Sequence, residues 1–264
     1  MIPLPMCIEH LTMPADPLYV TYIAILLLAF LSVFSTLLGV ALAIHIGMNE
    51  RGIAIGIGFS SGIMLLVSFF ELVPEAVSKA GPSMALTAFV LGMLIIMALH
   101  WVIPHTHLVE EKSAFRQASL RTAYLVTFGL ILHDVPEGFA MANSYIASPS
   151  LGVLVALAIA IHNVPEEFAM AVPIVMVKSR KFLYTAAFLS GLAEPLGAVI
   201  GLVAVHFHPV LNPLFMAFAA GAMVFVSVHE LLPIARRYQK THLFFLGAIL
   251  SVFVYALLTA MVPE

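Results

Sequence analysis

The chain has 264 residues, of which 62% are hydrophobic and 9% are charged, and its mean hydropathy is +1.09. This composition excludes an ordinary soluble domain and indicates a polytopic membrane protein. The formal net charge of −3 gives no reason to expect a nucleic-acid partner, and the single cysteine, Cys7, excludes both an intrachain disulfide and a thiolate metal cluster.

Eight apolar segments are long enough to cross about 30 Å of hydrocarbon as helices. We therefore expect an all-α integral membrane protein, with a single transmembrane domain over residues 1–264 and the lipid bilayer as its surroundings. The expected spans lie near 18–44, 52–75, 83–103, 120–145, 151–177, 182–205, 213–235 and 242–262.

The basic residues divide unequally between the two sides that these spans define. Ten of the eleven Lys and Arg residues fall in or beside the connections after the first, third, fifth and seventh spans, and only Lys79 lies opposite. Lys and Arg gather on the cytoplasmic side of membrane proteins. We therefore expect a multi-pass protein of the plasma (inner) membrane with both termini extracytoplasmic.

The second and seventh spans share a sequence pattern. Residues 62–76 read GIMLLVSFFELVPEA and residues 221–235 read GAMVFVSVHELLPIA, with eight of fifteen positions identical. In the expected topology these spans run in opposite directions. Spans one to three and six to eight would then be inverted repeats around spans four and five, a 3+2+3 arrangement that is typical of transporters with a site near the bilayer midplane.

The fourth and fifth spans carry a more specific repeat. Residues 132–142 read LHDVPEGFAMA and residues 161–171 read IHNVPEEFAMA, so eight of eleven positions are identical at an offset of 29 residues. Ionisable side chains inside an apolar run are costly, which makes these residues functional candidates. We expect the two copies to lie on adjacent helices and to build one metal site between them.

In each copy the histidine precedes the glutamate by four residues, so both side chains share one helix face. Imidazole and carboxylate are suitable ligands for divalent transition metals. One ion would bind His133, Glu137, His162 and Glu166. A second ion would bind Asp134, Asn163 and the same two glutamates, which would then bridge the metals. The alternative is a structural pair of His–Glu hydrogen bonds that joins the two helices.

Other polar side chains fit a metal pathway less specifically. Glu194 lies midway along the sixth span and is expected to be a further ligand or charge partner, or else to pair with a helix end. Four side chains near span ends would be steps before and after the site, or merely solvated: Glu71, Glu75, His229 and Glu230. In the loop at 104–119, His105 and His107 could capture metal weakly, although a solvated loop is the simpler interpretation.

The sequences HDVPEG at 133–138, HNVPEE at 162–167 and GLAEPLG at 191–197 resemble the ZIP (zinc/iron-regulated transporter-like) family, in its bacterial and archaeal zinc-permease branch. The resemblance implies an importer that delivers Zn²⁺, and often Fe²⁺, Mn²⁺, Co²⁺ or Cd²⁺, to the cytoplasm. It implies a binuclear site at His133, Asp134, Glu137, His162, Asn163, Glu166 and Glu194, with Glu71 approaching from outside and His229 and Glu230 on the exit path.

The chain departs from the family pattern at two positions. Asp134 stands where the family usually has Asn, and Glu167 stands where it usually has Gly. The alternative function from another class is an intramembrane di-metal enzyme, in which histidines and carboxylates would activate a water molecule for hydrolysis. The sequence does not decide the metal preference, the driving force or the oligomeric state, and it leaves a homodimer open.

Overall fold

The computed structural model describes residues 17–47, 49–102, 120–175, 179–237 and 239–262, and these residues contain helices but no strand. The prediction of an all-α fold is therefore confirmed. The first half of the bundle comprises α1 (Pro17–Ile46), α2 (Glu50–Val67), η2 (Ser68–Leu72), α3 (Val73–Ala80), α4 (Pro82–Val102) and α5 (Leu120–Ala147). The second half comprises α6 (Pro149–Val175), α7 (Arg180–Gly191), α8 (Ala193–Phe207), α9 (Leu211–Val226), η5 (Ser227–Leu231), α10 (Leu232–Arg237) and α11 (Thr241–Met261).

Within the described residues, seven helical passages are long and apolar enough to cross a membrane. They correspond to the predicted spans one, two, three, five, six, seven and eight. The predicted fourth span is the 28-residue helix α5, which is not among the seven. The total of eight crossings therefore stays a prediction for α5, although this helix packs against α6, α8 and α9 inside the bundle.

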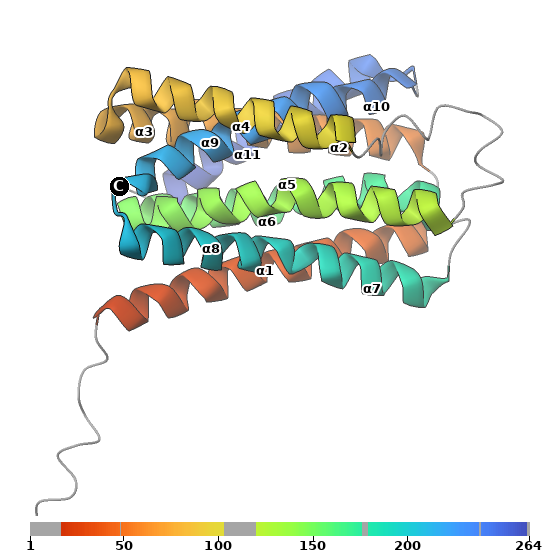
Figure 1. Ribbon diagram of the computed structural model, residues 1–264. Helices are drawn as coiled ribbons and strands as arrows, with labels where there is room; N and C mark the ends of the chain where they lie inside the picture. The colour runs from red at the N-terminus through yellow and green to blue at the C-terminus, as the bar shows by residue number, and fades with distance from the viewer. Residues whose placement is uncertain (1–16, 48, 103–119, 176–178, 238, 263–264) are drawn as a thin grey trace, which may run out of the picture.

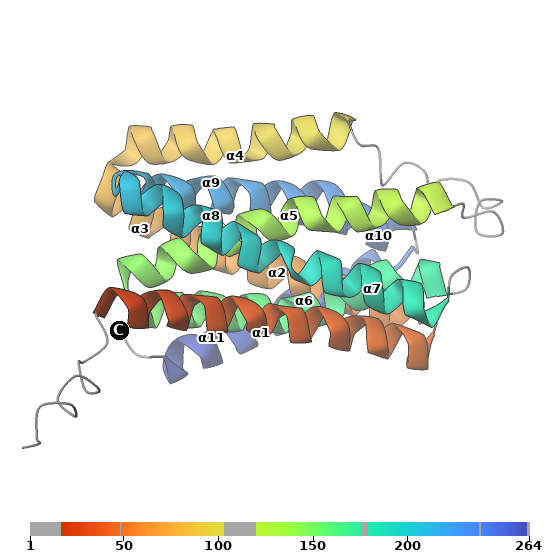
Figure 2. The same ribbon diagram turned by 60° about the horizontal axis from the view of Figure 1, so that its bottom comes forward.

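The helical passages alternate in direction along the bundle (Figure 1). In this view α1, α4, α6 and α9 run from left to right, whereas α2, α5, α7–α8 and α11 run from right to left. The turned view keeps the same antiparallel order (Figure 2). The described chain therefore begins at Pro17 and ends beyond α11 at the same end of the bundle, as an even number of passages requires.

The helix contacts fall into matched pairs. Helix α1 packs on α6 as α8 packs on α5, and α2 packs on α11 as α9 packs on α4. In the predicted inverted repeats, spans one, two and three correspond to spans six, seven and eight. Each of these helix contacts should therefore have an equivalent contact in the other half of the chain, as is observed. The pattern supports the 3+2+3 arrangement, which stays a prediction together with the helix count.

The second and seventh predicted spans are present, but neither is a continuous α-helix. Each contains a π-helical segment of five residues, η2 with the sequence SFFEL and η5 with the sequence SVHEL. These segments occupy equivalent positions in the repeat and are followed by Pro74 and Pro233. A π-helical turn adds one residue to the turn and re-aims the side chains around it, and it often marks a functional position.

The sixth predicted span is present over Arg180–Phe207 and is interrupted at one residue. Helix α7 ends at Gly191, Leu192 forms a turn, and α8 begins at Ala193. Pro195 is tolerated there because the N–H groups of a first helical turn have no intrahelical partner. Glu194 consequently lies in the first turn of α8, where the helix dipole favours a carboxylate.

Close helix packing fixes this broken end against α5. A Cβ atom at Gly138 of α5 would overlap the backbone carbonyl of Glu194, and a Cβ atom at Gly197 of α8 would overlap the carbonyl of Val135. The two glycines therefore allow the backbones to approach each other, as small residues do between membrane helices. This contact places Glu194 next to the motif of α5.

Candidate metal centre

The two copies of the repeated motif meet in the interior of the bundle, on α5 and α6. All six polar ligand candidates of the motifs are buried: His133, Asp134, Glu137, His162, Asn163 and Glu166. The histidine of each copy faces the glutamate of the other. His133 Nε2 lies 2.9 Å from Glu166 Oε1, and His162 Nε2 lies 3.3 Å from Glu137 Oε1. The structure thus brings the motifs together through crossed His–Glu pairs.

The hydrogen bond of His162 to its own helix defines the role of its second nitrogen. His162 Nδ1 lies 2.9 Å from the carbonyl oxygen of Ala158, and because a carbonyl only accepts, Nδ1 carries the proton. In the neutral imidazole Nε2 then presents a lone pair to the Glu137 carboxylate. Either a proton or a metal cation between these two atoms would satisfy both lone pairs. Two ligand atoms about 2.0 Å from a tetrahedral ion lie about 3.3 Å apart, which is the observed spacing.

A second group of carboxylates adjoins these pairs. Oxygen atoms of Asp134, Glu137 and Glu194 all lie within 4.8 Å of one another, and the three side chains are buried. Glu137 Oε2 has no hydrogen-bond partner among the described residues. A buried acceptor without a partner costs about 1–3 kcal/mol, so this oxygen is suited to be a metal ligand. The structure thus brings Glu194, which we predicted to be a further ligand or charge partner, close to Asp134 and Glu137.

Asn163 completes this second group from α6. Its Nδ2 donates to Glu194 Oε1 at 2.5 Å and to Ser32 Oγ at 3.0 Å. The amide nitrogen is therefore occupied, and the carbonyl oxygen is the atom of Asn163 that could bind a cation. These contacts connect α6 to α1 and α8.

Serines from three other helices hold the carboxylates, and the sequence analysis did not single them out. Ser60 of α2 donates to Glu166 Oε2 at 2.6 Å, and Ser190 of α7 donates to Asp134 Oδ2 at 2.7 Å. Ser32 of α1 donates to Glu194. Such partners orient metal ligands and fix their geometry. Polar residues inside apolar spans were the available signal, but many membrane serines bond only to their own helix.

The comparisons with known proteins agree with this geometry. Residues 105–260 match the family described as ZIP Zinc transporter. The zinc transporter ZupT of Chlorobium luteolum is 40% identical over 257 residues, which covers 89% of this chain and 96% of the relative. The ZupT protein of Corynebacterium aurimucosum is 38% identical over 254 residues, which covers 89% of this chain and 95% of the relative. The ZupT protein of Streptococcus mutans is 38% identical over 226 residues, which covers 79% of this chain and 85% of the relative.

The chain belongs to the ZIP family. It is accordingly a multi-pass membrane transporter of divalent metal ions, and the resemblance found in the motifs is confirmed. The buried cluster of carboxylates and histidines in this ZIP protein is compatible with a metal site.

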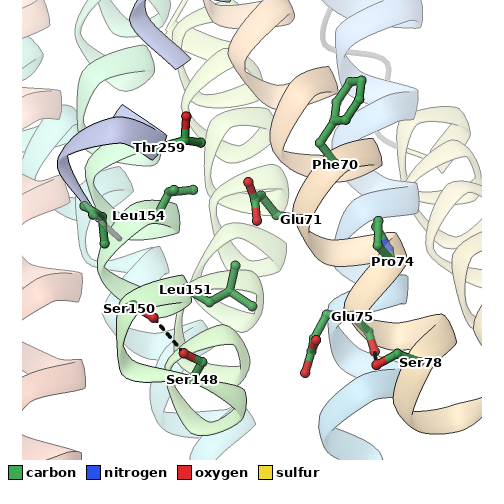
Figure 3. A pocket seen from close by; sticks show the side chains of 11 residues that line it. Phe70, Glu71, Pro74, Glu75, Ser78, Ser148, Ser150, Leu151, Leu154 and Thr259 are labelled. Atoms are coloured by element: carbon green, nitrogen blue, oxygen red, sulfur yellow. Dashed lines mark hydrogen bonds between the residues drawn. The ribbon is translucent and has the colours of Figure 1, made fainter. Parts of the chain in front are cut away.

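A cavity of about 610 Å³ opens at the end of the ZIP bundle where the described chain begins and ends. Glu71 of η2 and Glu75 of α3 line this cavity, together with Ser148 and Ser150 at the start of α6 (Figure 3). It lies on the side that we predicted to be extracytoplasmic and is therefore named the outer cavity. Tyr255 of α11 donates a hydrogen bond to Glu71. Leu154, which also lines the cavity, precedes His162 by eight residues, or about 12 Å along α6.

The remaining predicted pathway residues lie in different surroundings. Glu230 of η5 is buried and interacts electrostatically with His133, whereas His229 is exposed. Glu230 occupies the repeat position equivalent to Glu71, so one glutamate from each π-helical segment belongs to the predicted pathway. His105 and His107 lie outside the described residues.

Proposed function

We propose that this ZIP protein carries Zn²⁺ across the plasma membrane into the cytoplasm through a binuclear site between α5, α6 and α8. The observation that carries the proposal is the pair of crossed His–Glu contacts, which bring the buried histidine of each motif to the buried glutamate of the other. The ligands would be His133, Asp134, Glu137, His162, Asn163, Glu166 and Glu194. The zinc transporters that resemble the chain support Zn²⁺ as the cargo.

The proposed route begins at the outer cavity. Glu71 and Glu75 would attract the cation there, and Glu230 with His229 would receive it beyond the site. The ten-to-one division of Lys and Arg supports a cytoplasmic exit and extracytoplasmic termini. Fe²⁺, Mn²⁺, Co²⁺ and Cd²⁺ are further candidate cargoes, because the ligand set of nitrogen and oxygen atoms suits several divalent metals.

The experiment is zinc uptake into proteoliposomes that contain the purified protein. We expect His133→Ala and His162→Ala each to lower the uptake rate more than tenfold, because each removes one ligand from the shared site. A tenfold change corresponds to about 1.4 kcal/mol. The matched control is His45→Ala on α1. His45 is exposed, and its Nδ1 also contacts the carbonyl four residues earlier, Ala41, at 2.7 Å. Normal transport by both motif variants would contradict the proposal.

The same assay separates transport from the alternative of an intramembrane di-metal enzyme. Vesicles that contain only buffer and metal offer no substrate for hydrolysis, so metal accumulation requires a transporter. An enzyme would bind zinc at the same ligands but would not raise the internal zinc concentration above that of protein-free vesicles.

A further inference from the structure

Tyr255 of α11 joins two helical segments beside the outer cavity. Its hydroxyl donates a hydrogen bond to Oε1 of Glu71 in η2, although 184 residues separate the two in the chain. Glu71 lines the outer cavity, and so does Thr259, one helical turn beyond Tyr255 on α11 (Figure 3). The hydroxyl therefore acts on a carboxylate that faces the proposed entrance for metal.

The ring of Tyr255 contacts the same π-helical segment. It lies against Phe70, with the ring centroids 6.3 Å apart and the ring planes inclined by 43°. Phe70 directly precedes Glu71, so one side chain of α11 contacts η2 through both its ring and its hydroxyl. Aromatic pairs at this separation stabilise the contact between their helices. A Tyr255→Phe substitution would keep the ring contact and remove only the hydrogen bond.

The backbone that carries Glu71 gives a reason for this second support. Glu71 lies in the five-residue π-helical segment η2, whose wider turn re-aims its side chains, and Pro74 follows without an N–H group to donate. A glutamate side chain loses much rotamer freedom when it is fixed. A partner that fixes it before a cation arrives therefore lowers the cost of binding that cation.

The two carboxylates of the outer cavity have partners of different charge. Glu75 forms an ion pair with Lys79, whose Nζ lies 3.7 Å from Oε1, and this cation offsets its charge. Glu71 accepts its hydrogen bond from a neutral hydroxyl, which orients the carboxylate without neutralising it. An ionised carboxylate has about four lone-pair sites, so one hydrogen bond leaves it able to bind a cation. Glu71 is thus better suited than Glu75 to hold an incoming ion.

The internal repeat provides a comparison for the position of Tyr255. The motif at 62–76 recurs at 221–235, an offset of 159 residues. A Cβ atom at Gly62 would contact the backbone of Ala248 on α11, and a Cβ atom at Gly221 would contact the backbone of Phe89 on α4. Ala248 and Phe89 are separated by the same 159 residues, so the offset that relates the two motifs also relates α11 to α4.

Tyr255 departs from this repeat. The offset relates Glu71 to Glu230, and it relates Tyr255 to Ile96, which has no hydrogen-bonding side chain. Ile96 is buried, so the equivalent position of the other half accepts an aliphatic residue. The architecture that the two halves share therefore does not require the hydroxyl of Tyr255, whose acceptor lines the outer cavity.

We propose that Tyr255 is a positioning residue for metal entry: its hydroxyl holds the Glu71 carboxylate at the outer cavity, where this carboxylate first binds the divalent cation. Tyr255 itself does not touch the metal. The inference rests on the proposed function and adds a residue of α11 to it. The hydroxyl sets how well the outer face captures the ion, and it leaves the binuclear site unchanged.

The test measures zinc uptake by intact cells over a range of Zn²⁺ concentrations, so that only the outer face of the protein meets added metal. For Tyr255→Phe we expect the KM for uptake to rise about fivefold, while the maximal rate per molecule of protein changes less than about twofold. Equilibrium dialysis of the purified variant should give the wild-type Kd for the tightest bound Zn²⁺, because every proposed ligand of the binuclear site is still present.

The matched control is Tyr22→Phe. The hydroxyl of Tyr22 on α1 lies 3.1 Å from Nδ1 of His206 on α8, at the same end of the bundle. This substitution also removes a tyrosine hydroxyl that joins two helices, but neither Tyr22 nor His206 lines the outer cavity. Its KM should equal that of wild type.

The dependence on Glu71 separates positioning from a general effect on structure. Glu71→Ala should itself raise the KM, and Tyr255→Phe should add little in that background, because Tyr255 acts only through Glu71. An equal rise in the Glu71→Ala background would overturn the inference. So would an unchanged KM for Tyr255→Phe, with or without a lower maximal rate. If Tyr255→Phe has no effect while His162→Ala abolishes uptake, the inference fails and the proposed function stands.

Discussion

At the scale of single residues, the arrangement depends on which atom of each side chain is free. His162 uses Nδ1 on its own helix and turns Nε2 to the carboxylate of the other motif. Asn163 uses its amide nitrogen on Glu194 and Ser32, which leaves an oxygen for a cation. Serines occupy one oxygen of Asp134 and one of Glu166. These four candidate ligands are therefore oriented by a partner before metal arrives, which reduces the cost of binding.

The first prediction concerns Asp134. Asp134→Asn restores the residue usual in the family and removes one negative charge, so we expect the second ion to bind about tenfold more weakly while transport continues through the histidine pairs. Protons compete with metal for carboxylates and imidazoles, so uptake by wild type should fall as the outside pH decreases. The measurement is zinc uptake and bound-metal stoichiometry between about pH 5.5 and 7.5, around the ordinary imidazole pKa of about 6.5.

Two ions bound by Asp134→Asn with unchanged affinity, together with an unchanged pH profile, would show that Asp134 is not a ligand. A complete loss of transport would show instead that the second ion is required for the first to move.

The sequence indicated the residues of the candidate site, but it did not indicate how they pair. The repeated motif and the fourfold spacing indicated the histidines and carboxylates, because few other functions keep such groups in an apolar span. The crossed contacts of His133 with Glu166 and of His162 with Glu137 depend on the relative rotation of α5 and α6. Helix rotation is set by packing, which the spacing within one helix does not report.

At the scale of the helices, breaks rather than continuous spans position the pathway. The turn at Leu192 places Glu194 at the start of α8, and η2 and η5 carry Glu71 and Glu230. Hydropathy gave the approximate extent of these spans because their composition is uniform. It could not reveal the breaks, because a π-helical turn or a single non-helical residue leaves the average hydropathy of a segment unchanged.

The second prediction concerns the contact of α5 with α8. Gly197→Ala forces a Cβ atom into the backbone of Val135, which should destabilise the protein by about 1–3 kcal/mol and displace Glu194. The measurement is thermal unfolding in detergent together with zinc affinity. Gly201→Ala is the matched control on the same helix, because its Cβ atom would first meet side-chain atoms of Asn143 and Phe139, at 3.0 and 3.4 Å, which can move. Equal effects of the two substitutions would contradict this explanation.

At the scale of the whole molecule, the alternating passages and matched helix contacts resemble two halves of opposite orientation around one interior site. Glu71, which lines the outer cavity, and the buried Glu230 are related by the same exchange of halves. A carrier built in this way can offer its site to either end of the bundle by similar movements of equivalent helices. Which end faces the cytoplasm follows here only from the distribution of Lys and Arg.

The third prediction tests that orientation. In a protein whose Cys7 is replaced by Ser, we introduce Ser78→Cys at the outer cavity or Ser179→Cys before α7, both at exposed positions. On intact cells, a membrane-impermeant thiol reagent should label the Ser78→Cys variant and spare the Ser179→Cys variant, which should react only after lysis. The native Cys7 should be labelled from outside as well. The opposite result would reverse the proposed topology.

The most direct test of the central claim, one binuclear site shared by both motifs, is the anomalous scattering of crystals grown with zinc. We predict two metal peaks about 3.5–4 Å apart, the spacing of two-metal sites, with Glu137 and Glu166 contributing to both ions and His133 and His162 to one. A single ion bound by only one of the two motifs, or metal-free motifs whose crossed His–Glu contacts persist in the presence of zinc, would contradict the account.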